Sequence, residues 1–211
     1  MQIVFNSILP KYLTKDEVKY SELYLRENIH FDKHKNYLIN ANSGYGKTSF
    51  LNLIFGINLD YHGEIFYDGN QLSREKIQKL RINEISYVFQ DFKLFPKLTA
   101  LENILLKNNL TKHKSVEEIT DMLKQCNLYV KKDSLLMNLS RGQKQRVAII
   151  RSLCQPYKIL MLDEPFSHLD LDNIKKVVNL IKSDLKLKQA SMIITDLKKN
   201  SLFDYDKTYN L

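Results

Sequence analysis

Residues 41–48, with the sequence ANSGYGKT, combine the residue types that can hold a phosphate chain. Gly44 and Gly46 allow successive backbone N–H groups to close around an anion without a Cβ in the way. We expect Lys47 to reach the β- and γ-phosphate oxygens of a nucleotide, and the Thr48 hydroxyl to ligate Mg²⁺. The further residues of this loop that we expect to contact the nucleotide are Asn42, Ser43, Tyr45 and Ser49.

The loop lies between two segments of different character. An apolar run, Tyr37-Leu38-Ile39, precedes it and indicates a strand, and residues 49–55 follow with a helical pattern. A strand, a glycine-rich loop and a helix in this order favour a phosphate site, because the helix N-terminus adds a partial positive charge.

Other polar residues follow apolar segments further along the chain. Residues 139–146, LSRGQKQR, open a helical pattern that ends before Pro156, and Ser140 is placed to cap that helix. Residues 159–162 predict a buried strand, directly followed by the carboxylates of Asp163 and Glu164. Residues 85–89 alternate like a strand and lead to Gln90.

The elements that must position these residues can be read from the apolar pattern. We expect a central parallel sheet built from the runs near Ile39, Tyr87, Leu160, Ile193 and Tyr209, with helices between them. Residues 2–34 predict a small antiparallel sheet, to which residues 63–69 return as part of a hairpin. Residues 91–154 are mostly helical in pattern, including 115–126.

In this order, the segments resemble the motifs of ABC ATPases over almost the whole chain. Residues 41–48 resemble the phosphate loop, with Ala41 in place of its first glycine, and residues 139–146 resemble the LSGGQ signature segment. Asp163-Glu164 resembles a Walker B box with its catalytic glutamate, residues 167–170 the D-loop, and Gln90 the Q-loop glutamine.

The resemblance implies an α/β fold with a P-loop NTPase core. This core would hold a central, mainly parallel sheet, an N-terminal antiparallel β subdomain and a helical signature subdomain. We expect one ABC ATPase domain over residues 1–211, in which 1–90 and 156–211 form the nucleotide-binding core and 91–155 the helical subdomain.

The resemblance also implies roles for individual residues in ATP hydrolysis with Mg²⁺. Two subunits would face head to tail, so that Lys47 and Thr48 act in cis while Ser140, Gly142 and Gln143 meet the γ-phosphate in trans. Thr48, Gln90 and Asp163 would hold Mg²⁺, and Glu164 would polarise the attacking water with Gln90 beside it. Tyr12 is the first candidate to stack on adenine, and Tyr20 the second.

The chain departs from the family pattern at two positions. The family normally has a switch histidine after the strand at residues 192–195, and Asp196 stands there; no histidine follows His168. We expect a carboxylate at this catalytic position to repel the γ-phosphate and slow turnover. Arg141 replaces the first signature glycine, and it either reaches water or turns toward the phosphate and offsets Asp196 in trans.

Composition narrows the classes of protein further. The chain has 211 residues and a formal net charge of +8, but its lysines are dispersed and no nucleic-acid motif is present, so we expect no nucleic-acid partner. No apolar run approaches the ~18 residues that a membrane span needs. The scattered histidines and the two cysteines, Cys126 and Cys154, show no metal-ligand spacing.

The segment after Gln90 predicts a protein partner. Phe92, Phe95 and Pro96 place apolar side chains where a permease docks in relatives. We therefore expect the ATP-binding subunit of an ABC transporter, a homodimer or paired ATPase, cytoplasmic and peripheral on the inner face of the cell membrane.

The direction of transport, the transported substrate and the ability to hydrolyse ATP at a full rate stay open at this stage. The docking segment resembles both lipoprotein or macrolide exporters and amino-acid importers. The chain ends on its last expected strand, without a regulatory tail, which favours export of a peptide, lipoprotein or drug. Asp196 alternatively indicates a hydrolysis-impaired, nucleotide-gated regulatory subunit. A soluble ABC ATPase acting on nucleic acid or ribosomes is disfavoured, because the chain has one loop and one signature.

Overall fold

The computed structural model describes residues 1–42, 46–71, 73–197 and 200–211. Its strands and helices run in the following order: β1 (Ile3–Pro10), β2 (Ile29–Phe31), β3 (Asn36–Asn40), α1 (Lys47–Ile54), β4 (Tyr61–Tyr67), α2 (Arg74–Asn83), β5 (Ile85–Val88), α3 (Ala100–Asn108), α4 (Val116–Gln125), η1 (Tyr129–Lys131), η2 (Leu136–Asn138), α5 (Arg141–Leu153), β6 (Ile159–Asp163), α6 (Leu171–Lys188), β7 (Ser191–Asp196) and β8 (Lys207–Asn210).

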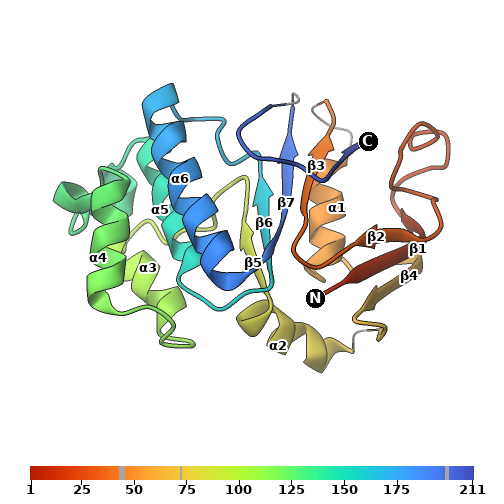
Figure 1. Ribbon diagram of the computed structural model, residues 1–211, viewed down its shortest axis with the longest axis horizontal. Coiled ribbons are helices and arrows are strands. Elements are labelled where there is room, and N and C mark those ends of the chain that lie inside the picture. The colour runs from red at the N-terminus through yellow and green to blue at the C-terminus, as the bar shows by residue number, and fades with distance from the viewer. Residues whose placement is uncertain (43–45, 72, 198–199) are drawn as a thin grey trace.

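Two sheets organise the chain. The larger one has the order β5-β6-β7-β3-β8 and its paired strands are parallel, whereas β2-β1-β4 form an antiparallel sheet. The parallel sheet stands in the middle of the molecule, the antiparallel sheet on one side and helices α3 to α5 on the other (Figure 1). This arrangement confirms the expected fold class, including the return of residues 63–69 to the N-terminal strands.

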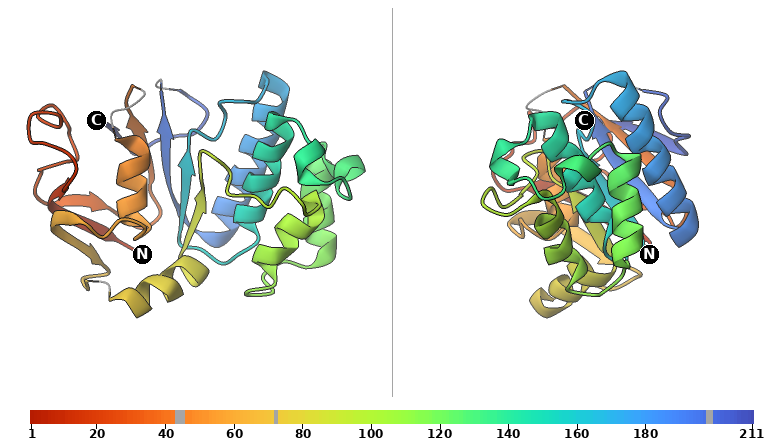
Figure 2. Two further views of the ribbon diagram at one scale, coloured as in Figure 1. Left: turned by 180° about the vertical axis from the view of Figure 1, so that it is seen from behind. Right: turned by 90° about the vertical axis from the view of Figure 1, so that its left-hand side faces the viewer.

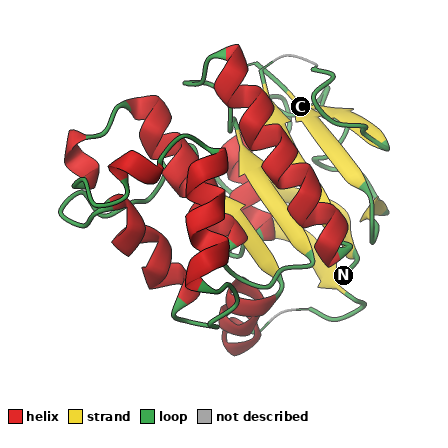
Figure 3. Cartoon of the chain, turned by 60° about the vertical axis from the view of Figure 1, so that its left-hand side comes forward, coloured by secondary structure: helices red, strands yellow, loops and turns green. Residues whose placement is uncertain are grey.

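The parallel sheet is buried on both faces, as its apolar strands require. Successive residues of β3 enter different cores: Leu38 packs with the cluster that includes α4, α5 and α6, and Ile39 packs with α1 and the antiparallel sheet. Helices cover the near face of the yellow strands in Figure 3. Seen from behind, α1 lies next to the antiparallel sheet, far from α4 (Figure 2). The carboxyl ends of β3, β6 and β7 are thereby held by rigid packing.

Local sequence explains where the helices begin. Thr99, Ser115 and Ser140 each cap a helix, and each forms a capping box with the residue three positions later. Among the helices that the structure describes, none combines the length and the apolar character that crossing a membrane demands.

Candidate nucleotide-binding site

The loop that was expected to bind phosphate connects β3 to α1. Gly46 is the residue before α1 and has a left-handed backbone, with φ of 86°, which glycine adopts without strain. The Tyr24 hydroxyl donates a hydrogen bond to the Gly46 carbonyl oxygen over 3.1 Å and fixes the end of the loop. Ser49 follows within α1. Ser43, Gly44 and Tyr45 lie outside the described residues, so their contacts stay predictions.

Lys47 lies at the base of this loop and is only 5% exposed. Its ammonium group donates to the carbonyl oxygens of Ala41 and Asn42, at 2.7 and 3.0 Å. It also forms an ion pair with Glu164, with 3.1 Å between Nζ and Oε1. A buried charge needs such partners. The ion pair places the expected phosphate-binding cation beside the expected catalytic carboxylate.

Asp163 ends strand β6 and is 1% exposed. Thr48 donates to its Oδ2 over 2.7 Å, and Thr195 donates to its Oδ1 over 2.6 Å. A third hydroxyl, that of Tyr87, lies 3.4 Å from Oδ2. Burial raises the pKa of Asp163 and the charge of Glu164 adds to the rise, whereas these hydrogen bonds oppose it. The result is a buried carboxylate whose charge would be stabilised by a cation.

Glu164 forms hydrogen bonds with the Q-loop glutamine and with the signature helix. Gln90 donates from Nε2 to Glu164 Oε2 over 3.1 Å. Gln145, one turn into the signature helix α5, donates to the Glu164 carbonyl oxygen over 3.2 Å and accepts from the backbone N–H of His168. Glu164 itself has a left-handed backbone, with φ of 46°, which costs a non-glycine residue about 1–3 kcal/mol. Its neighbours therefore hold the backbone of Glu164 in an unusual conformation.

The signature residues form the start of α5. Ser140 Oγ accepts from the Gln143 backbone N–H at 3.2 Å, and the Gln143 side chain accepts from the Ser140 N–H at 2.9 Å. Gly142 lies very close to the backbone of residues 167–170: a Cβ added at Gly142 would lie only 2.6 Å from the His168 carbonyl oxygen. The start of the signature helix and the D-loop are thus packed on each other within one chain.

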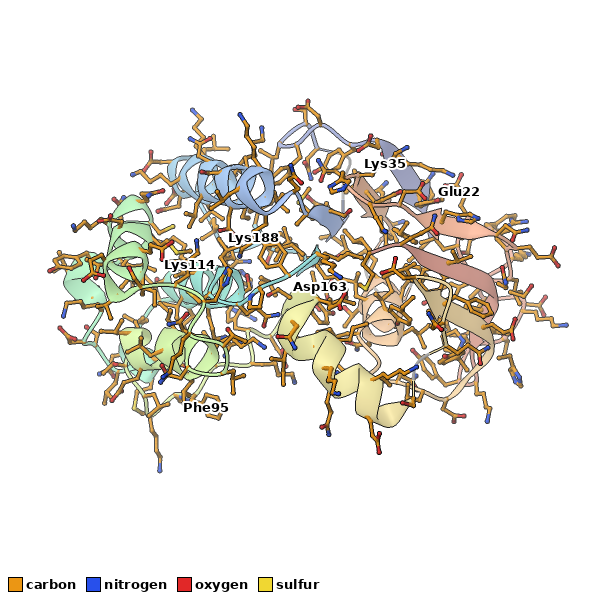
Figure 4. The ribbon with its side chains drawn as sticks, turned by 60° about the horizontal axis from the view of Figure 1, so that its bottom comes forward. Glu22, Lys35, Phe95, Lys114, Asp163 and Lys188 are labelled. Carbon is orange, nitrogen blue, oxygen red and sulfur yellow. The ribbon has the colours of Figure 1, made fainter. Side chains whose placement is uncertain are left out.

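One cavity of about 570 Å³ brings Thr48, Gln90, Asp163 and Glu164 together. Arg141 is exposed and also lines this cavity, next to His168; burial, followed by the charge of Arg141, lowers the pKa of His168. The cavity is lined by side chains from α1 and the loop after it, the Q-loop segment, the end of β6, the signature and the D-loop: Thr48, Asn52, Ile57, Phe89, Gln90, Asp91, Lys93, Arg141, Asp163, Glu164, Ser167 and His168. Figure 4 labels Asp163 at the centre of the molecule.

Asp196 lies at the carboxyl end of β7, in register with Asn40 of β3. Its backbone oxygen accepts from the Ala41 N–H over 3.3 Å, next to the phosphate loop. Its carboxylate accepts from the Leu197 N–H at 2.7 Å and from Asn200 Nδ2 at 2.6 Å. The carboxylate is therefore engaged by donors of the loop that follows.

The two candidate adenine contacts are both tyrosines at the surface. Tyr12 is 57% exposed and lies close enough to Tyr24 that its charge adds to the burial that raises the pKa of Tyr24. Because Tyr24 bonds to Gly46, Tyr12 belongs to the surroundings of the phosphate loop. Tyr20 is more exposed still. Stacking on adenine remains a prediction for either ring.

The donor atoms of this cavity fit Mg²⁺. Thr48 and Asp163 offer hard oxygen atoms, and the Gln90 side chain lines the same cavity. Among the residues that the structure describes, no cluster of three or more His, Cys, Asp or Glu side chains could hold a metal alone. Mg²⁺ typically takes one or two protein oxygens and completes its coordination with substrate phosphate and water, which matches this donor set.

Sequence reasoning missed three residues of this site. Tyr87, Gln145 and Thr195 are buried side chains within regular elements, where hydroxyl or amide groups carry no motif. Only Thr195 had a usable signal, because it directly precedes Asp196 at the carboxyl end of a strand.

The parallel sheet, the phosphate loop and the Asp163-Glu164 pair define a nucleotide-binding protein with a P-loop, and comparison with known proteins identifies its family. The family model described as ABC transporter matches residues 26–167. The chain therefore belongs to the ABC transporter family, and it is an ATP-binding ABC ATPase, as the motifs predicted.

Several curated relatives can be aligned over most of the chain. YclH of Bacillus subtilis, named an uncharacterized ABC transporter ATP-binding protein, is 37% identical over 180 residues, covering 83% of this chain and 79% of its own. HrtA of Staphylococcus saprophyticus, named for putative hemin import, is 35% identical, and the alignment covers 82% of this chain and 81% of HrtA. LolD of Buchnera aphidicola, named for a lipoprotein-releasing system, is 31% identical and covers 79% and 81%.

A solved structure supports the fold and the activity. The dimeric structure of MJ0796, a bacterial ABC transporter cassette, matches with a TM-score of 0.75 and 29% identity, covering 92% of this chain and 87% of that one. A second structure of the same cassette, in a post-hydrolysis state with ADP and Pi, matches with a TM-score of 0.74.

Proposed function

We propose that this protein is the energy-coupling subunit of an ABC transporter, peripheral on the cytoplasmic face of the membrane. Two copies, or this chain and a paired ATPase, would bind ATP between the phosphate loop of one and the signature of the other. The dimeric cassette structure supports this arrangement. No nucleic-acid partner is proposed, because the positive charge is dispersed over the sequence.

The side chains divide the chemistry among them. Lys47 and Thr48 bind and orient the phosphates in cis, and Ser140, Gly142 and Gln143 contact the γ-phosphate in trans. The Glu164 carboxylate accepts a hydrogen bond from the attacking water and so polarises it, and Gln90 holds the Glu164 carboxylate in place. Mg²⁺, held by Thr48, Asp163 and Gln90, would neutralise charge on the phosphates. Asp196 reduces the rate through its negative charge.

The observation that carries the coupling role is the path from Glu164 through Gln90 to an exposed groove. After Gln90 the chain makes a strained turn, since Phe92 and Lys93 have φ of 66° and 46°. Arg151 of α5 donates to both of their carbonyl oxygens, at 2.6 and 2.7 Å. The turn is thereby tied to the signature helix, so a force on this segment would reach the Gln90 side of one ATP site and the signature that completes the other site of the dimer.

Phe95 follows this turn and is 56% exposed (Figure 4). It borders a groove of about 380 Å³, whose other apolar members are Phe55, Tyr87, Phe89, Leu106 and Leu110. Exposed apolar side chains around a groove favour a protein partner. We propose that residues 91–155 act as the helical lobe, that 1–90 and 156–211 act as the nucleotide-binding core, and that this groove receives the permease.

For the transported substrate we propose export of a peptide, lipoprotein or drug. Similarity to LolD supports this assignment. Import is the second candidate, since HrtA is named for hemin import and ArtM of Bacillus subtilis, 34% identical over 158 residues, for arginine transport. A hydrolysis-impaired regulatory subunit is the third candidate, and Asp196 is the observation that favours it.

The coupling role is tested by the variant Phe95→Asp. The tagged protein is used to capture its partner from detergent-solubilised membranes of the native cell, and multi-spanning proteins are identified by mass spectrometry. We expect Phe95→Asp to lose the permease and to keep ATP affinity within about twofold. Val130→Asp is the matched control, because Val130 is 92% exposed but lies outside the groove. Loss of ATP binding or of the fold in Phe95→Asp would show that Phe95 is a core residue instead.

A further inference from the structure

Thr195 is a fully buried polar residue that the motifs do not include. It lies near the end of β7, directly opposite Asp163 in the parallel pairing of β6 with β7. Its hydroxyl donates to Asp163 Oδ1 over 2.6 Å and accepts from the Glu164 backbone N–H over 3.2 Å. One hydroxyl therefore contacts both acidic residues of the site.

Each of these two contacts answers a physical need. Asp163 is buried, and a short hydrogen bond from a hydroxyl stabilises its charged form and fixes the direction of its carboxylate. Glu164 has a left-handed backbone, and its N–H is shared between Thr195 Oγ1 and the Thr195 carbonyl oxygen, both at 3.2 Å. Both atoms of Thr195 that bind Glu164 thus support a conformation that the isolated residue disfavours.

We propose that Thr195 is a positioning residue of the ATPase site, whose hydroxyl orients the Asp163 carboxylate and holds the Glu164 backbone at the same time. This inference depends on the proposed roles of Asp163 and Glu164. Thr48 also binds Asp163, but through the other carboxylate oxygen, Oδ2. Loss of the Thr195 hydroxyl would therefore free the carboxylate to rotate about its contact with Thr48.

Valine is the suitable replacement, because it matches the shape of threonine and lacks the hydroxyl. We expect Thr195→Val to lower kcat by about tenfold to a hundredfold, since a hydrogen bond to a buried charged group is lost. The apparent KM for ATP, measured with Mg²⁺, should rise together with the loss of Mg²⁺-dependent affinity, because Asp163 supports the metal. Thr195→Ser keeps the hydroxyl and should restore at least half of the kcat of the original protein.

The second readout is nucleotide binding without turnover. Fluorescent ATP-analogue affinity is measured in EDTA and again with Mg²⁺, and the ratio of the two affinities reports how well the carboxylate supports the metal. We expect Thr195→Val to retain affinity in EDTA within twofold and to lose most of the gain caused by Mg²⁺. Ser191→Ala is the matched control: Ser191 is a buried hydroxyl at the other end of β7 and bonds to the Asp32 carbonyl oxygen, remote from Asp163.

The possible outcomes separate this inference from the proposed function. If Thr195→Val equals the original protein in kcat and in the Mg²⁺ gain, or if Thr195→Ser is as impaired as Thr195→Val, the positioning role is overturned. If the original protein itself neither hydrolyses ATP nor gains affinity from Mg²⁺, the proposed function fails instead. Should Thr195→Val not fold, Thr195→Cys replaces it. The thiol is a weak hydrogen-bond donor, so the kcat of Thr195→Cys must lie between the kcat of Thr195→Ser and the background rate of ATP hydrolysis.

Discussion

Removing the negative charge of Asp196 should accelerate ATP hydrolysis. At an effective dielectric constant of ~20 and a separation of ~4 Å, one like-charge pair costs on the order of 4 kcal/mol before screening. The structure argues for a smaller value here, because Leu197 N–H and Asn200 Nδ2 both donate to this carboxylate and offset part of its charge. With salt screening added, we take about 1–2 kcal/mol as the effect on the transition state, which corresponds to about fivefold to thirtyfold in kcat.

The variant Asp196→Asn isolates the charge, because the amide has the same shape. Its oxygen can still accept from the Leu197 N–H, but its amide nitrogen then faces Asn200 Nδ2, so the hydrogen bond with Asn200 is lost, at a cost of about 1–2 kcal/mol in the free energy of unfolding. We therefore expect kcat to rise about fivefold to thirtyfold while Tm falls by a few degrees. Asp196→His should change kcat in the same direction.

Steady-state phosphate release at saturating ATP measures the effect. Asp121→Asn is the control, because it removes one carboxylate from the exposed surface of α4 and should leave kcat unchanged. A folded Asp196→Asn protein with the kcat of the original protein, or a lower one, would refute the argument that this charge slows the reaction.

Two further predictions concern the signature. Gly142→Ala should lower kcat more than about tenfold, because its Cβ would lie 2.6 Å from the His168 carbonyl oxygen and must displace either the signature or the D-loop; unchanged kcat would show that this close approach is not needed. If Arg141 offsets Asp196 in trans, Arg141→Gly should reduce kcat while Asp196 is present and should have almost no effect on kcat in the Asp196→His background. Additive effects of the two substitutions on kcat in this double-mutant cycle would exclude that compensation.

Much of the fold could be predicted from local pattern. The strands near Ile39, Leu160 and Ile193 are short apolar runs that only a sheet covered on both faces can bury, and they became β3, β6 and β7. The spatial order β5-β6-β7-β3-β8 was not predicted, because it depends on pairing between residues far apart in the chain. The family resemblance supplied the architecture that periodicity alone could not.

The site was predictable where backbone geometry demands particular residue types. Gly46 and Lys47 form a recognisable motif because a left-handed turn and a buried cation restrict the sequence. Thr195 was missed because a threonine in a buried strand is also an ordinary β-former. The contacts of the Asp196 carboxylate were equally hidden, since they depend on how Asn200 folds back onto it.

ATP-driven dimerisation tests the central claim most directly. Glu164→Gln preserves the shape of a side chain that contacts Lys47 and Gln90, but it should block hydrolysis and so preserve the ATP-bound state. In multi-angle light scattering with ATP and Mg²⁺, we predict that Glu164→Gln is a dimer and that Lys47→Ala stays a monomer. A monomeric Glu164→Gln protein at saturating ATP would contradict the head-to-tail ATPase site.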